Sequence, residues 1–86
     1  MPEISRFYGI IIRMYFEDHN PPHFHAEYQG MKAEYDIRTL DIINGKLPNR
    51  AHAMILEWAS LHKSELLENW NKAIIPEPLE KIEPLN

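Results

Sequence analysis

The chain has 86 residues, 44% of them hydrophobic, which is enough for one domain with one modest core. It contains no cysteine, which excludes disulfides and thiolate zinc sites and leaves histidine and carboxylate side chains as metal ligands. The formal net charge is −4, with nine basic residues scattered among thirteen acidic ones, which disfavours binding to nucleic acid.

The same features predict where the protein works. A cysteine-free chain is typical of the reducing cytosol. The stretch MPEISRFYG has no basic region followed by an apolar run, so we expect no secretory signal. The longest apolar block, residues 10–16 interrupted by Arg13, is far too short to span a bilayer. We therefore expect a cytoplasmic protein without a membrane partner.

Residues 10–47 contain short segments in which apolar and polar residues alternate, separated by Gly or Pro. Such a period of two predicts β-strands. The predicted strands are residues 10–17, 23–28 and 32–38. A short hairpin with arms 41–43 and 46–47 is expected next, because Asn44-Gly45 suits a two-residue turn in which both residues have positive φ.

From residue 49 to about residue 73 the apolar residues recur with the period of an α-helix and form one broad arc. Pro76 excludes a longer helix. Residues 76–86 contain three prolines, so we expect an extended tail rather than an interior strand. The predicted fold class is α+β, an antiparallel meander of three to four short strands with one long C-terminal helix packed on one face. Residues 1–75 would form the single domain.

One core is expected between the sheet and the helix. The residues predicted to form it are Ile10, Ile12, Met14, Phe16, Phe24, Tyr35, Trp58 and Leu61. In the helix, His62 lies inside the apolar arc and is interpreted as a core histidine. In the tail, Leu79, Ile82 and Leu85 are spaced by three and can face one groove, on this domain or on a second copy. They are candidate partner-binding residues, and a homo-oligomer is compatible with them.

The stretch DHNPPHFHAEY, residues 18–28, holds three of the five histidines. His23 and His25 share one face of the predicted strand, and a two-residue turn at Gln29-Gly30 would set them opposite acidic residues of the next strand. The loop at residues 18–22 would turn the chain so that the first strand, residues 10–17, pairs with residues 23–28 and places its polar side chains beside theirs. The expected rows are Arg13, Glu27 and Lys32; Tyr15, His25 and Glu34; Glu17, His23 and Asp36.

This polar face has two interpretations. In the first, which we prefer, it is a solvated lattice of cross-strand ion pairs, each contributing about 0.2–1 kcal/mol. In the second, His23 and His25 are metal ligands or acid–base groups, His19 on the Pro-Pro loop supplies a third nitrogen, and nearby carboxylates orient or complete the site.

Two imidazoles fill only half of a tetrahedral shell. We therefore expect no firmly bound cofactor and at most weak binding of divalent zinc or nickel. The sequence contains no phosphate-binding loop, no nucleophile elbow and no HExxH helix, so no catalytic residue is assigned.

Three segments resemble a known family. They are MPEISRFYGIIIRMYFEDHNPPHFHAEY, GKLPNRAHAMILEWASLHKSELLENWNKA and EPLEKIEPL. The ISRFYG start, the HNPPHFHA block, the LEW helix and the I-x-PL ending occur in this order, and the chain resembles the small bacterial domain-of-unknown-function family 4160 over nearly its whole length. The resemblance implies a neighbouring gene from another uncharacterised family, number 2442, in an arrangement proposed to be a toxin–antitoxin pair. It supplies no catalytic residues.

Three functional hypotheses follow. The leading one is a cytosolic protein-interaction module, not an enzyme, that is one member of a toxin–antitoxin-like system and binds a protein partner encoded nearby. The second is a small metal- or histidine-dependent hydrolase, for example an RNase, that uses the HNPPHFH segment. The third is a transcriptional regulator, the label that some relatives carry, but the acidic charge and the lack of a helix-turn-helix disfavour it.

Overall fold

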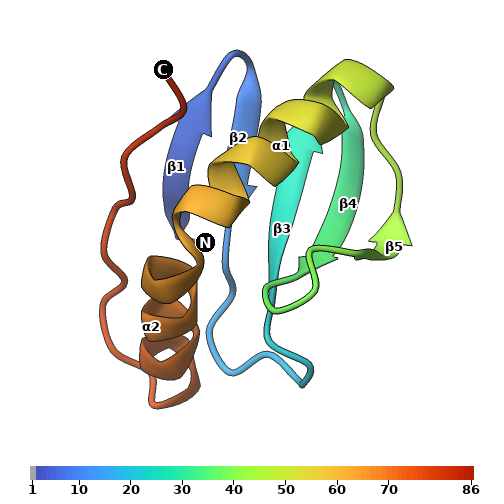
Figure 1. Cartoon of the computed structure of the whole chain (residues 1–86). Helices are drawn as coiled ribbons and strands as arrows, with labels where there is room; N and C mark the ends of the chain where they lie inside the picture. The colour runs from blue at the N-terminus through green and yellow to red at the C-terminus, as the bar shows by residue number, and fades with distance from the viewer. Residues whose placement is uncertain (1) are drawn as a thin grey trace.

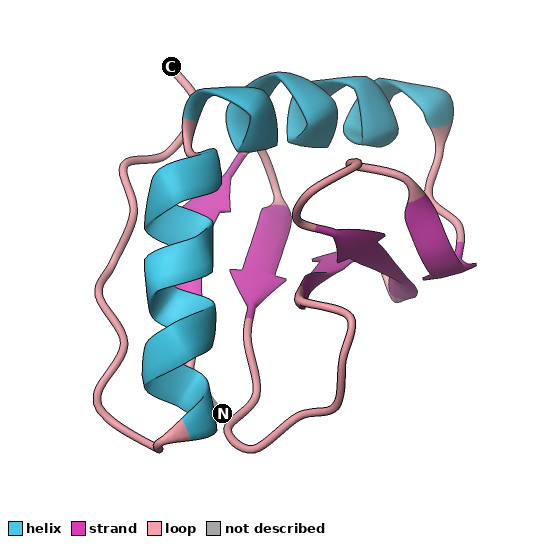
Figure 2. Cartoon of the chain, turned by 60° about the horizontal axis from the view of Figure 1, so that its bottom comes forward, coloured by secondary structure: helices cyan, strands magenta, loops and turns pink. Residues whose placement is uncertain are grey.

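The computed structural model describes residues 2–86, and Met1, the first residue of the predicted domain, lies outside them. Within residues 2–86, five strands form one antiparallel sheet in the order β1-β2-β3-β4-β5, and two helices cover one of its faces (Figures 1 and 2). The elements are β1 (Glu3–Phe7), β2 (Ile10–Arg13), β3 (His23–Tyr28), β4 (Met31–Asp36), β5 (Ile42–Gly45), α1 (Asn49–Leu61) and α2 (Lys63–Ile74). The predicted α+β meander is confirmed, whereas three to four strands become five and the single helix becomes two.

β1 is the strand that the sequence pattern did not predict. It pairs with β2 through a turn in which Tyr8 and Gly9 both have positive φ, 49° and 79°. The register between the strands shifts between Glu3 and Ser5, and the side chains of Ile4 and Ser5 are both buried. This irregularity removes the apolar–polar alternation that marks a strand in a sequence.

Two predicted strands end earlier than expected. β2 ends at Arg13 instead of residue 17, and Phe16 is 44% exposed, so its predicted place in the core is wrong. β4 ends at Asp36 instead of residue 38. The reason is a turn in which Asp36 Oδ1 accepts hydrogen bonds from the backbone N–H groups of Arg38 (2.7 Å) and Thr39 (3.0 Å). β3 has the predicted bounds.

The predicted hairpin around Asn44-Gly45 is wrong. β5 is instead one strand that pairs with β4, with Asn44 opposite Glu34 and Gly45 opposite Ala33. A Cβ atom at Gly45 would lie 2.2 Å from the carbonyl oxygen of Lys32, so this glycine allows a close approach of two strands. Pairing of β5 with the larger sheet is favoured over the predicted separate hairpin, because an isolated two-stranded hairpin is only marginally stable.

The helical segment is divided at His62, where α1 and α2 meet at an angle (Figure 2). His62 has non-helical backbone angles, φ −127° and ψ 23°, and its Nδ1 atom lies 2.6 Å from the carboxylate of Glu65 in the first turn of α2. Leu61 is consequently 68% exposed and His62 only partly buried, so the predicted core positions of both are wrong. Neither helix within residues 2–86 is long and apolar enough to cross a membrane.

The core lies between the sheet and the two helices. Six of the eight predicted core residues are buried, namely Ile10, Ile12, Met14, Phe24, Tyr35 and Trp58. The Trp58 ring is fully buried, with its centroid 5.9 Å from that of Phe24. Because side chains alternate along a strand, Phe24 and Tyr35 face this core while His25 and Glu34 project from the opposite face of the sheet.

The tail, residues 76–86, lies against the domain beside β1 (Figure 1). The backbone N–H of Ile82 donates to the carbonyl oxygen of Ile4 (2.8 Å), and Trp58 Nε1 donates to the carbonyl oxygen of Glu83 (2.8 Å). Ile82 is 3% exposed, and Leu79 and Leu85 are partly buried against the core. Ile82 is therefore unavailable to a partner while the tail stays docked.

Candidate functional site

The hairpin of β3 and β4 places the polar face as the sequence predicts. His25 lies opposite Glu34, His23 opposite Asp36 and Glu27 opposite Lys32, so the predicted register of this pair is confirmed. The two-residue turn at residues 29–30 causes this register, because both residues adopt the positive φ that such a turn requires.

The predicted register of β2 against β3 is wrong by two residues. Arg13 lies opposite His25 rather than Glu27, because β2 ends at Arg13 and the segment that follows leaves the ladder. The shift keeps side chains on the expected face, so Arg13 Nε still lies 3.2 Å from Glu27 Oε2 and the Tyr15 ring meets the His25 ring edge-on at 4.3 Å. Glu17, however, is exposed, and its backbone N–H donates to the Ala73 carbonyl oxygen (2.9 Å). Among the described residues, the ion-pair partners of His23 are Asp18 and Glu34, not Glu17.

His23 is a buried histidine with a fixed tautomer. It is 1% exposed, and its Nδ1 atom lies 2.7 Å from the carbonyl oxygen of Pro21. A carbonyl oxygen only accepts, so Nδ1 carries the proton and Nε2 of a neutral ring presents its lone pair. Among the described residues this Nε2 has no well-aligned hydrogen-bond partner, although it lies 3.0 Å from Asp18 Oδ2 and 3.6 Å from Glu34 Oε1. A lone pair that faces carboxylates needs a proton or a cation between them.

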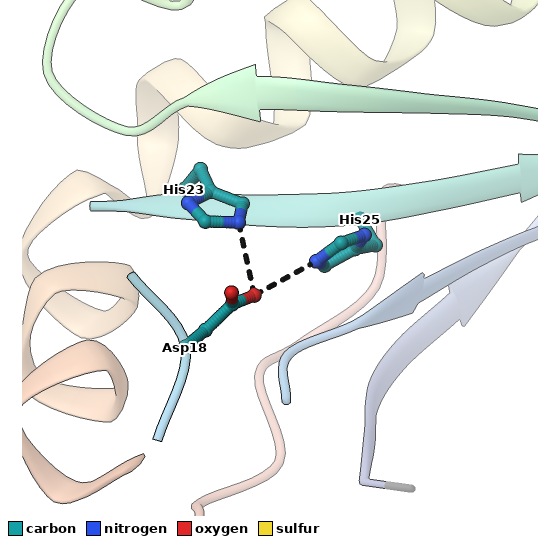
Figure 3. A group of neighbouring side chains, drawn as sticks. All are labelled: Asp18, His23 and His25. Atoms are coloured by element: carbon teal, nitrogen blue, oxygen red, sulfur yellow. Dashed lines mark hydrogen bonds and ion pairs between the residues drawn. The ribbon is translucent and has the colours of Figure 1, made fainter. Parts of the chain in front are cut away.

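Asp18 is the residue that joins the two histidines, as Figure 3 shows. Its Oδ2 atom lies 3.0 Å from His23 Nε2 and 3.2 Å from His25 Nε2, and its Oδ1 accepts the backbone N–H of His19 (2.9 Å). Partial burial raises the pKa of Asp18, but the hydrogen bonds from the His19 backbone and His25, with the charges of His23 and His25, outweigh it and hold this pKa below its usual value. The group is therefore a carboxylate at neutral pH.

The three ligand atoms of Asp18, His23 and His25 all lie within 4.8 Å of one another. A tetrahedral zinc ion with bonds of about 2.0–2.1 Å separates its ligand atoms by roughly 3.4 Å, so the spacing fits an ion after small movements. His19, the third ligand predicted from the sequence, has a side chain that is 84% exposed. Its Nδ1 lies 3.0 Å from Asp18 Oδ1 and its ring centroid 5.6 Å from that of His23, but it is not part of the three-ligand group. Asp36 forms the turn after β4 instead of joining this group.

A cavity of about 240 Å³ opens beside this group on the polar face of the sheet. We call it the groove; its polar lining comes from Tyr15, His25, Glu27, Lys32, Glu34 and Asn44. Glu34 links the two places, because Oε1 approaches His23 Nε2 while Oε2 accepts a long hydrogen bond from Asn44 Nδ2 (3.5 Å). A molecule in the groove would therefore have one end near the ligand atoms.

Two nitrogens and one carboxylate match the protein ligands of a catalytic zinc site, in which water or substrate takes the fourth position. Pro21 supplies the hydrogen bond through its backbone carbonyl that commonly orients a metal-bound histidine. Asp18 has no periodic pattern around it that would identify it as a ligand. Its only signals in the sequence are its charge and its place before the two prolines that turn the chain back toward His23.

The chain belongs to the family described as a domain of unknown function (DUF4160), whose family model matches residues 9–71. The matched span contains Asp18, His23, His25 and Glu34, and it ends before the tail. No curated protein and no solved structure matches the chain.

Proposed function

We propose that the protein is a metal-dependent hydrolase in which Asp18, His23 and His25 hold one divalent ion such as Zn²⁺. The observation that carries the proposal is the buried Nε2 atom of His23, which lacks a well-aligned hydrogen-bond partner and lies 3.0 Å from Asp18 Oδ2. An ion bound there would replace the unfavourable contact between a lone pair and a carboxylate with two coordination bonds.

Metal ligands must be deprotonated at the coordinating atom, so an ion bound here would take the place of the proton that joins His25 Nε2 to Asp18 Oδ2. The hydrogen bond of Nδ1 to Pro21 leaves Nε2 of His23 free to coordinate.

Glu34 lies beside the proposed ion, since its Oε1 is 3.6 Å from His23 Nε2. An ion held by Asp18, His23 and His25 would activate a water molecule and polarise a substrate carbonyl. Glu34 would then accept the proton released as the water oxygen bonds to the carbonyl carbon, and would return it to the leaving group as the bond to that group breaks.

Titration of the metal-free protein with Zn²⁺ and Co²⁺, followed by calorimetry and by the absorption of cobalt, tests the site. We expect one ion per chain and a loss of affinity of about 100-fold or more in Asp18→Asn and in His25→Asn, by comparison with the effects of changing groups around known sites. His19→Ala is the matched control, because this exposed neighbour lies outside the three-ligand group. Unchanged affinity in Asp18→Asn, or an equal loss in His19→Ala, would overturn the assignment.

A second candidate is the protein-interaction module, which the open edge of β5 supports. The tail covers the β1 edge, whereas β5 pairs only with β4 within residues 2–86, and Ile42 and Ile43 are 37% and 45% exposed. An open strand edge with apolar side chains can accept a strand from another protein. Co-purification with the neighbouring gene product should then fail for Ile43→Asp and succeed for Ile74→Asp, an exposed control on α2. A complex that tolerates Ile43→Asp would exclude this edge.

A further inference from the structure

The charges along the groove select its ligand. The carboxylate of Glu27 is compensated by Arg13, whose Nε lies 3.2 Å from Glu27 Oε2. Within residues 2–86, no carboxylate lies within ion-pair distance of the Lys32 ammonium. A divalent ion would balance Asp18 and Glu34, so that one positive charge, that of Lys32, is left over in the groove.

We propose that the groove binds a small ester or amide that carries a carboxylate, with the carboxylate on Lys32 and the hydrolysable carbonyl at the metal. This inference rests on the proposed metal site. One lysine matches the single charge of a carboxylate, whereas a phosphate monoester carries about −1.5 to −2 at neutral pH and would be incompletely paired.

The spacing along the sheet agrees with a small substrate. Lys32 lies opposite Glu27, in the row next to that of His25 and Glu34 on the same face. Neighbouring rows on one face are about 7 Å apart along a strand. A substrate whose carbonyl and carboxylate are separated by a few bonds can therefore reach both the metal and the flexible lysine side chain.

Hydrolysis of such a substrate would leave a dicarboxylate in the groove. The bond between the carbonyl carbon and the leaving group breaks, the oxygen of the metal-bound water becomes part of a new carboxylate, and the leaving group departs with a proton. Glutarate therefore imitates the product, while pentanoate has the same chain length with a methyl group in place of the second carboxylate.

The test uses the protein loaded with Co²⁺ and follows the cobalt absorption during titration with glutarate and with pentanoate. We expect glutarate to bind about tenfold more tightly, as one charge-assisted hydrogen bond of modest strength would give. Lys32→Met should remove this preference and leave the affinity for pentanoate, whose one carboxylate binds the metal, unchanged. Lys46→Met is the matched control, because Lys46 is exposed and does not line the groove.

The outcomes separate this inference from the proposed function. Failure of Co²⁺ to bind rejects both. Binding of Co²⁺ with equal affinities for the two probes, or with a preference that survives Lys32→Met, rejects the carboxylate subsite alone. Tighter, Lys32-dependent binding of 3-phosphonopropionate than of glutarate would identify a phosphoryl ligand instead and would overturn the proposed substrate class.

Discussion

Replacing Asn69 with Ala should release the C-terminal tail from the domain. Asn69 is 1% exposed, and its amide makes two hydrogen bonds to one residue of the tail. Nδ2 donates to the carbonyl oxygen of Glu80 (2.8 Å), and Oδ1 accepts the backbone N–H of Glu80 (2.9 Å). Both backbone groups of Glu80 lose their partners in the variant.

The expected cost follows from these contacts. Each of the two hydrogen bonds contributes about 0.5–1.5 kcal/mol, and a buried group left without a partner costs about 1–3 kcal/mol. If the tail leaves the surface to hydrate Glu80, the burial of Ile82 is lost instead, at about 1.5–3 kcal/mol. Either way the free energy of unfolding should fall by about 2–4 kcal/mol, which lowers the melting temperature of a domain of this size by roughly 10 °C or more.

Thermal and urea denaturation followed by circular dichroism measure this change. Asn71→Ala is the matched control, because Asn71 lies on the same helix and is exposed. A double-mutant cycle with Ile82→Ala adds a second check, since two residues that hold one tail should not have additive effects. An Asn69→Ala protein within about 0.5 kcal/mol of the Asn71→Ala protein, the range of ordinary surface substitutions, would refute the role of this amide.

Three further predictions concern the sheet and the metal site. Burial raises the pKa of Tyr35 to about 12. The stability that comes from keeping the buried hydroxyl protonated is complete below the unfolded pKa of about 10. Between the two pKa values it falls by about 1.4 kcal/mol per pH unit as the pH rises. Urea denaturation across this range should show a smaller alkaline loss in Tyr35→Phe; an unchanged loss would contradict the raised pKa. Gly45→Ala should lower the free energy of unfolding by at least about 2 kcal/mol more than Gly30→Ala does. Both glycines have positive φ, but only a Cβ at Gly45 would collide with backbone, at 2.2 Å. Equal denaturation midpoints of the two variants would show that β4 and β5 can separate freely. Zn²⁺ at about 100 times its Kd should stabilise the native protein by about 2.7 kcal/mol, and a similar shift of the melting curve in Asp18→Asn would place the ion elsewhere.

The sequence by itself determines the centre of the sheet. The alternation in residues 23–28 and the turn at residues 29–30 predict the bounds of β3, and together they predict the pairing of His25 with Glu34 that the structure contains. These features are local, because a period of two and a two-residue turn leave only one register that keeps polar side chains on one face. The buried positions of Phe24 and Tyr35 follow from the same alternation.

The helix break and the third ligand were decided only by tertiary structure. The helical period continues through Leu61 and His62, but the turn between α1 and α2 exposes Leu61 because the chain changes direction to cover another part of the sheet. Asp18 lies in a connection without periodicity, so no pattern predicts where its carboxylate points. Long-range backbone hydrogen bonds on both sides of Asp18, from Glu17 to Ala73 (2.9 Å) and from Ile37 to Pro22 (3.0 Å), hold the connection where the carboxylate reaches both imidazoles. Such contacts join residues far apart in the chain, and they exist only after the helices and the sheet have packed together.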